Sequence, residues 1–294
     1  MPRTTPAQIG TTVAPRADAK LARGGRTPVS PGVLAIPASF SSSDGAYDLA
    51  IHFHGNTELV IDNFGAAGVN AAVLVINLGI NSGVYEDRYA NPDELKDLLS
   101  RTQRAMERRG LENAHLRRLA LTSWSAGYGA ILRSIENPTL FEMVDSIVLL
   151  DGLHARVLGD GDSKLDSKLD TMRIEPFVKF ARGAVAGNKL FVITHSEVQP
   201  PDYAGVRETT DALLAAVGVT RQPGGTSPEM PALTATHGVP KSKIIPLEPR
   251  TEADAGGLHV RGFAGVTAEH HMAHLIRMAT VGLPELSRRY PASR

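Results

Sequence analysis

The sequence predicts an α/β fold built on a mostly parallel central sheet with helices on both faces. Apolar runs of strand length alternate with amphipathic helical segments through most of the chain. One run, residues 71–78 (AAVLVINL), is almost wholly apolar, which is typical of a parallel strand covered on both faces. Polar side chains capable of chemistry follow directly after several of these runs, where ligands bind in sheets of this kind.

Each element is predicted from its own pattern. Strands are expected where short apolar or alternating runs end in turn residues. Helices are expected where apolar residues recur three and four positions apart, as Leu95, Leu98 and Leu99 do after Pro92. The expected strands are residues 33–40, 47–54, 71–78, 118–122, 144–150, 189–194, 243–247 and 258–263. The expected helices are residues 57–64, 92–109, 126–135, 175–185, 207–217 and 268–281.

Composition narrows the classes of function. The 294 residues include 42% hydrophobic residues, enough for a sizeable core. The 31 basic and 31 acidic side chains balance, whereas nucleic-acid-binding proteins usually carry a basic excess. The longest apolar run, residues 71–80, is too short to cross a bilayer. Because there is no cysteine, disulfides, thiolate metal sites and cysteine nucleophiles are excluded.

The chain is expected to form one domain, residues 31–294, preceded by a mobile arm. Residues 1–30 show no apolar periodicity, which favours a loosely packed segment. Two stretches interrupt the strand–helix alternation, near residues 152–176 and 221–240, and are expected to be loop excursions. Residues 1–30 contain no apolar core of a secretory signal, so the sequence fits a cytoplasmic protein or an exported form whose leader has been removed.

The candidate nucleophile is Ser125. Residues 119–130 (LALTSWSAGYGA) are typical of a strand, a sharp turn and a helix. Such a turn forces its central serine into a strained conformation and demands small residues two positions away on each side. Ser123 and Gly127 meet that demand. The N–H groups of the following helix would also favour negative charge near Ser125.

A His-Gly pair upstream is the candidate source of an oxyanion hole. His54-Gly55-Asn56 follows an earlier strand. Acyl transfer creates a negatively charged oxygen that preorganised backbone N–H groups stabilise. The expected donors are the N–H of Ala126 and one N–H from Gly55 or Asn56.

Asp151 is the candidate acid. It ends the strand after the serine turn, where a buried carboxylate can orient a histidine. Glu197, after the next strand, is the rival, and Asp202 is a third choice.

The candidate base lies in the cluster Glu269-His270-His271-Met272-Ala273-His274 near the end of the chain. His271 is preferred and His270 is the second choice, because either suits a position where a loop opens a helix. His274 is expected to have a supporting or capping role.

Taken together, Ser125, Asp151 and His271 stand in the chain order Ser, acid, His, with His54-Gly55 upstream. This arrangement resembles the α/β-hydrolase-fold serine hydrolases over roughly residues 31–285. The resemblance implies a sheet of about eight strands, an acyl-serine intermediate and no cofactor. The expected substrate is a small molecule or polymer carrying an ester or amide. Ser123 departs from the family pattern, which has glycine at that position of the turn.

Two other functions compete with this prediction. His52 and His54, together with His270, His271 and His274, are ligand types that bind zinc or a similar ion in metal-dependent hydrolases. A non-catalytic binding protein on the same fold is the other alternative, since the serine turn departs from the family pattern.

Overall fold

A computed structural model describes residues 16–158, 168–226 and 237–292, and confirms the predicted α/β architecture. One sheet of 10 strands forms the centre of the molecule, with the order β1-β2-β4-β3-β5-β6-β9-β12-β11-β10. The pairs from β4 through β12 are parallel, and the strands at both edges are antiparallel. The mostly parallel core therefore has antiparallel strands added on each side.

The strands of this sheet have the following bounds: β1 (Thr27–Val29), β2 (Gly32–Ala35), β3 (Ala46–Phe53), β4 (Ala72–Ile76), β5 (His115–Trp124), β6 (Val144–Leu150), β9 (Leu190–His195), β10 (Gln222–Pro223), β11 (Pro249–Ala255) and β12 (Leu258–Phe263). A separate hairpin pairs β7 (Val157–Leu158) with β8 (Lys168–Leu169).

The helices have these bounds: α1 (Thr57–Ala66), α2 (Ser82–Tyr89), α3 (Pro92–Arg108), α4 (Tyr128–Glu136), α5 (Pro138–Met143), α6 (Glu175–Val185), α7 (Val206–Val217), α8 (Ala268–Ile276), α9 (Met278–Val281) and α10 (Pro284–Arg289). Three short 3-10 turns are η1 (Ser125–Gly127), η3 (Thr171–Ile174) and η4 (Lys241–Lys243). No helix in the described part of the chain has the length and hydrophobicity that a membrane crossing requires.

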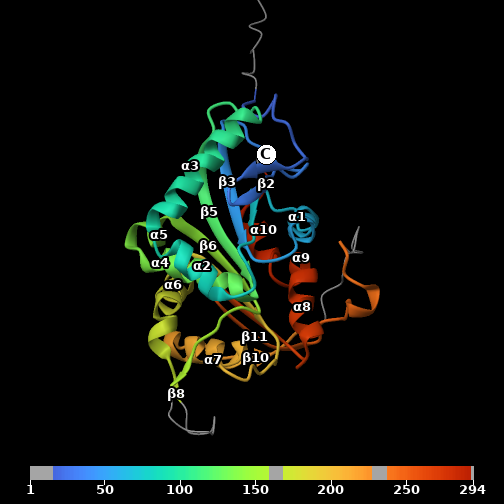
Figure 1. Ribbon diagram of the computed structural model, residues 1–294. Coiled ribbons are helices and arrows are strands. Elements are labelled where there is room, and N and C mark those ends of the chain that lie inside the picture. The colour runs from blue at the N-terminus through green and yellow to red at the C-terminus, as the bar shows by residue number, and fades with distance from the viewer. Residues whose placement is uncertain (1–15, 159–167, 227–236, 293–294) are drawn as a thin grey trace, which may run out of the picture.

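Two apolar layers cover the two faces of the sheet. Alternate residues of β3 divide between them: Leu49 and Ile51 pack in the larger layer, and Ala50 packs in the smaller one. The larger layer includes side chains of α2 to α7, and the smaller includes those of α1 and α8 to α10. Figure 1 shows α3, α4 and α5 on one side of the sheet and α1, α8 and α9 on the other. Helices therefore lie on both faces, as predicted.

The prediction of a strand at residues 243–247 is wrong. That segment begins in the turn η4, and the strand next to β12 is β11, a few residues later. β11 has the sequence PRTEADA and only Ala253 is buried. A strand with such a polar composition lacks the apolar pattern on which strand prediction depends.

The amino-terminal segment is packed from residue 16 onward, unlike the mobile arm predicted for residues 1–30. Ala17 and Leu21 are buried, and β1 pairs with β2 within the sheet. Arg23 pairs with Asp18 and also donates to the Phe40 carbonyl at 2.8 Å, while Asp18 accepts from the Ser42 N–H, so this pair ties the segment to residues 40–42. This packing could not be predicted from apolar periodicity, because hydrogen bonds from arginine and from the backbone, rather than an apolar stripe, hold the segment in place. Residues 1–15 lie outside the described residues, as do residues 159–167 and 227–236 of the predicted excursions.

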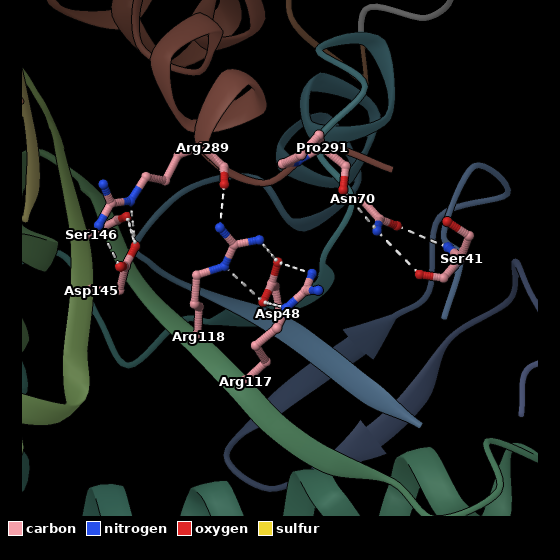
Figure 2. A network of polar contacts seen from close by, with 9 residues as sticks. All are labelled: Ser41, Asp48, Asn70, Arg117, Arg118, Asp145, Ser146, Arg289 and Pro291. Carbon is pink, nitrogen blue, oxygen red and sulfur yellow. Dashed lines mark hydrogen bonds and ion pairs between the residues drawn. The ribbon is translucent and has the colours of Figure 1, made fainter. Parts of the chain in front are cut away.

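A cluster of charged residues ties the amino-terminal end of the sheet to the end of the chain. Asp48 of β3 is fully buried, and both Arg117 and Arg118 of β5 bind its carboxylate through paired hydrogen bonds of 2.6 to 3.1 Å. Figure 2 shows Arg118 reaching onward to the backbone carbonyl of Arg289. The Arg289 side chain binds Asp145 at 2.7 Å. These charge-assisted contacts fix the last helix against β3, β5 and β6.

We expect Asp48→Ala to lower the free energy of unfolding by about 3 kcal/mol, because removing one partner leaves two guanidinium groups without their counter-charge. Both arginines are partly exposed, so water offsets part of the loss. Urea unfolding measures the change. Asp93→Ala is the control, since it removes an exposed carboxylate paired with Lys96 and should change stability by no more than about 0.5 kcal/mol. A loss for Asp48→Ala as small as the control's would contradict a stabilising role for the cluster.

Candidate active site

Ser125 occupies a strained turn between β5 and α4. Its φ angle is +49°, in the left-handed region that residues other than glycine rarely adopt. Small neighbours make the turn possible: a Cβ on Gly127 would lie 2.1 Å from the carbonyl oxygen of Phe53. Ser123 is fully buried. The sharp strand-to-helix turn predicted from the sequence is therefore present, and its crowding explains the small residues on both sides.

The end of β6 lies against this turn. A Cβ on Gly152 would come within 2.6 Å of the Ser125 carbonyl oxygen, so the chain after Asp151 packs directly on the serine backbone. The register pairs Trp124 with Leu150 on these neighbouring parallel strands. Because parallel strands end at the same edge of the sheet, Ser125 and Asp151 come to lie on adjacent strand ends.

Asp151 is buried and holds three hydrogen bonds. Its Oδ1 accepts from the Ser196 N–H at 2.8 Å, and its Oδ2 accepts from Ser196 Oγ at 2.7 Å. The same Oδ2 lies 2.7 Å from Nδ1 of His271. Burial opposes ionisation of Asp151, but nearby His274, His271 and the Ser196 N–H outweigh it and hold the pKa of this carboxyl below its ordinary value. Asp151 is therefore ionised at neutral pH.

His271 is brought to the serine turn by Trp124. The Trp124 Nε1–H donates to the His271 backbone carbonyl at 3.1 Å, and the two rings lie 4.7 Å apart between centroids. Trp124 directly precedes Ser125, so the imidazole sits beside the turn while its Nδ1 faces Asp151. Within residues 16–158, 168–226 and 237–292, no hydrogen bond joins Ser125 Oγ to His271.

The other candidates for acid and base bind elsewhere. Nδ1 of His270 lies 2.8 Å from Thr267 Oγ1, and Glu197 pairs with Arg207 at 2.9 Å. His274 is fully buried, with Nδ1 2.7 Å from Thr194 Oγ1, and burial lowers its pKa to about 4. Asp202 is exposed. Of the histidines in the final cluster, His271 is the one that contacts Asp151.

The His54-Gly55 turn faces Trp124 from the other side. The His54 ring stacks on the Trp124 ring at 5.1 Å with 5° between their planes, and its Nδ1 lies 3.1 Å from the Tyr85 hydroxyl. The Gly55 N–H donates to Asn77 Oδ1 at 2.9 Å, so this donor already has a partner. Asn56 caps α1 by accepting from the Leu59 N–H. Since Gly55 is engaged, the Asn56 N–H is the freer donor of the predicted pair.

The histidines considered as metal ligands do not form a cluster. Both ring nitrogens of His52 have partners, Thr122 Oγ1 at 2.9 Å and the His54 carbonyl at 3.0 Å. Burial lowers the pKa of His52 to about 3. Among the described residues, no group of three or more His, Asp and Glu side chains is arranged to hold a metal ion.

A cleft of about 600 Å³ opens beside the serine turn. Ser125 and Ala126 line one part of it. The remaining walls come from residues 80–83, 86–87, 154–156 and 202–203, together with Tyr128 and Arg173. This space lies beyond the carboxyl ends of the parallel strands, where α/β sheets bind ligands.

Sequence reasoning missed Ser196. Its side chain and its N–H both donate to the Asp151 carboxylate. The sequence pattern pointed instead to Glu197, the next residue, as a rival acid. The signal was available, because Ser196 directly follows β9, and β9 is the neighbour of the strand that ends before Asp151. A hydroxyl at an adjacent strand end is well placed to donate to a buried carboxylate.

Comparison with known proteins adds distant structural similarities. No family model matches the sequence, and a search of curated proteins found no match either. Similar solved structures include a glucuronoyl esterase from Solibacter usitatus, with 13% identity, 86% of this chain and 78% of that chain covered, and a TM-score of 0.39. A siderophore hydrolase from Aspergillus nidulans has 11% identity, coverage of 92% and 93%, and a TM-score of 0.44. A soluble variant of monoglyceride lipase from Saccharomyces cerevisiae has 9% identity, coverage of 98% and 99%, and a TM-score of 0.41.

The fold is assigned from the chain's own architecture. A parallel core runs from β4 to β12, β2 pairs antiparallel with β4, and a strained serine turn follows β5. Together, this topology and this turn give the chain the α/β-hydrolase fold.

Proposed function

We propose that this protein is a serine hydrolase that cleaves a carboxylic ester or amide, with Ser125 as nucleophile, His271 as base and Asp151 as acid. The observation that carries the proposal is the buried Asp151 carboxylate, hydrogen-bonded to the partly exposed His271 next to a strained serine turn. Backbone strain and a buried, fully hydrogen-bonded carboxylate are both costly unless the surrounding structure supports them. Their meeting at one sheet edge favours a catalytic role.

The hydrogen bond to Asp151 would set the protonation of His271. With Nδ1–H donating to the carboxylate, Nε2 is left as the basic nitrogen. As Ser125 Oγ attacks the substrate carbonyl carbon, the hydroxyl proton passes to Nε2. We expect the Ser125–His271 hydrogen bond to form when substrate fills the cleft, since such bonds commonly tighten on binding.

The following steps use the same groups in turn. The tetrahedral oxyanion would accept hydrogen bonds from the N–H of Ala126, with the Asn56 N–H, or less favourably Gly55, as second donor. Collapse of this intermediate breaks the bond to the leaving group, which takes the proton from His271. Water then attacks the acyl-serine while His271 accepts its proton, and the acid product departs as Ser125 regains its hydrogen.

Ser125→Ala should abolish ester turnover and labelling by a fluorophosphonate probe, because the attacking oxygen is gone. Thermal stability should change little, since the side chain is only partly buried. Ser123→Ala is the matched control: it removes a buried hydroxyl that has no partner in the described structure and should leave labelling intact. Peptide mapping of the labelled protein identifies the site. Labelling that persists in Ser125→Ala would refute the assignment.

His271→Gln should reduce kcat for a chromogenic ester by at least about a thousandfold, because the general base and its contact with Asp151 are lost together. The neighbouring His270→Gln should retain activity within about threefold, since His270 binds Thr267 instead. Both variants are assayed with the same ester at pH 7. Equal losses in the two variants would mean that the base has been misassigned.

Ser196→Ala should lower the free energy of unfolding at pH 7 and make it fall less as the pH is lowered. Asp151 has a depressed pKa, so its contribution to stability is present above the unfolded value of about 3.9 and disappears as pH falls through the folded value. Removing the Ser196 Oγ donor raises the folded value toward the unfolded one, so less stability is lost on acidification although the loss begins at the same pH. Urea unfolding between pH 7 and pH 3 measures this.

Ser196→Thr serves as the rescue variant, because it keeps a hydroxyl at the same position. It should restore the wild-type pH dependence, whereas turnover in Ser196→Ala should fall about tenfold through loss of a hydrogen bond to a charged group. Identical pH dependence in Ser196→Ala and wild type would show that the Oγ bond does not stabilise the ionised carboxylate.

A further inference from the structure

We propose that the cleft beside Ser125 binds an ester of a polyhydroxylated, sugar-like alcohol rather than an ester of a long hydrocarbon. This inference rests on the proposed serine hydrolase function and adds the substrate class. At about 600 Å³, the cleft lies within the range of roughly 300–1,000 Å³ common for small-molecule sites. The character of its walls decides what kind of molecule it accepts.

One wall is a fixed ionic network. Arg173 pairs with the buried Glu86 and lies 3.4 Å from the Tyr128 hydroxyl, while Arg133 also approaches Glu86 at 3.5 Å. A hydrocarbon chain lying on these groups would strip their water and give no hydrogen bonds in return. Hydroxyl groups would replace that water without such a cost.

The remaining charged groups have opposite signs. Arg156, Asp87 and Asp202 are exposed in the cleft and have no ion-pair partner in the part of the chain that is described. The two carboxylates would repel a purely anionic ligand, and the guanidinium would repel a purely cationic one. A neutral ligand that both donates and accepts hydrogen bonds suits all three, and hydroxyl groups have this property.

A third wall combines aromatic rings with polar tips. His154 lies edge-on between Tyr128 and Tyr203, with ring centroids 5.4 Å and 4.9 Å away. Its Nδ1 is buried and has no partner within the described residues. Burial lowers the pKa of His154 to about 4, so the ring is neutral near pH 7 and adds no charge to this wall. These rings give apolar contact, and Tyr203, which is 40% exposed, also carries a hydroxyl group that can bind hydroxyl groups of a ligand.

Apolar surface in the cleft is limited. Ile80 and Tyr203 are the exposed large hydrophobic side chains among the described lining residues. A long acyl or alkyl chain needs a continuous apolar wall to gain binding energy from water exclusion. Two separate side chains do not provide it, so polar contacts are left to determine specificity.

The test compares two acetate esters with the same number of carbon atoms, methyl 6-O-acetylglucoside, which carries hydroxyl groups, and cyclohexylmethyl acetate, which carries none. The wild type should show a kcat/KM at least about tenfold higher for the sugar ester, because a hydrogen bond to a charged group contributes a factor of roughly ten to a hundred. Arg156→Ala and Asp202→Asn should each reduce kcat/KM for the sugar ester about tenfold and change that for cyclohexylmethyl acetate less than twofold. Equal or faster turnover of cyclohexylmethyl acetate, or equal losses on both esters, would overturn the inference.

Arg104→Ala is the matched control, since this exposed arginine of α3 does not line the cleft and its loss should affect neither ester. Binding of methyl 6-O-acetylglucoside to Ser125→Ala, measured by calorimetry, separates this inference from the proposed reaction. Binding that weakens in the Ser125→Ala/Arg156→Ala double variant, with no turnover by wild type, would support the cleft assignment and refute the catalytic one. Fluorophosphonate labelling at Ser125 in a protein that does not bind the sugar ester would support the catalytic assignment and refute the cleft assignment.

Discussion

The buried carboxylate of Asp151 is the group around which this edge of the sheet is organised. An ionised carboxylate taken out of water is tolerated only when its oxygens are hydrogen-bonded. Here the donors come from the end of β9 and from α8, while the Asp151 N–H donates to the Thr194 carbonyl. The positions of β6, β9 and α8 are therefore mutually dependent, because a shift of β9 or α8 relative to β6 would remove hydrogen-bond donors from the buried charge.

The amino-terminal and carboxyl ends of the parallel strands carry different kinds of contact. At the amino-terminal end, Asp48 and its two arginines join β3 and β5 to the last helix (Figure 2). At the carboxyl end, the same two strands lead into the His54 turn and the Ser125 turn. Charge at the first end fixes the sheet and the chain end together. Precisely positioned groups need a supporting framework, and the strained turn and buried charge at the second end lie on strands that this cluster joins together.

The sequence revealed the parallel core and the strand ends because both depend on local patterns. Apolar runs identify β3, β4, β5 and β6, and Ser125 and Asp151 follow two of them directly. What it could not reveal depends on partners far along the chain. Asn77 engages the Gly55 N–H from another strand end, and β11 is a strand because β12 pairs with it, not because of its own polar residues. The choice between His270 and His271 likewise depends on helix rotation: neighbouring side chains point about 100° apart, and the orientation of α8 turns His271 toward Asp151.

Several histidines surround Asp151, and their environments give them different roles. Burial lowers the pKa values of His154, His195 and His274 to about 4 each, so these rings are neutral near pH 7. Attraction between His274 and Asp151 consequently matters mainly in acid, where His274 can take up a proton. Near neutrality, the carboxylate depends on its hydrogen bonds from Ser196 and His271. His271 combines that bond with partial exposure to solvent, as its proposed role as base requires, while the neutral buried histidines add no positive charge to the site near pH 7.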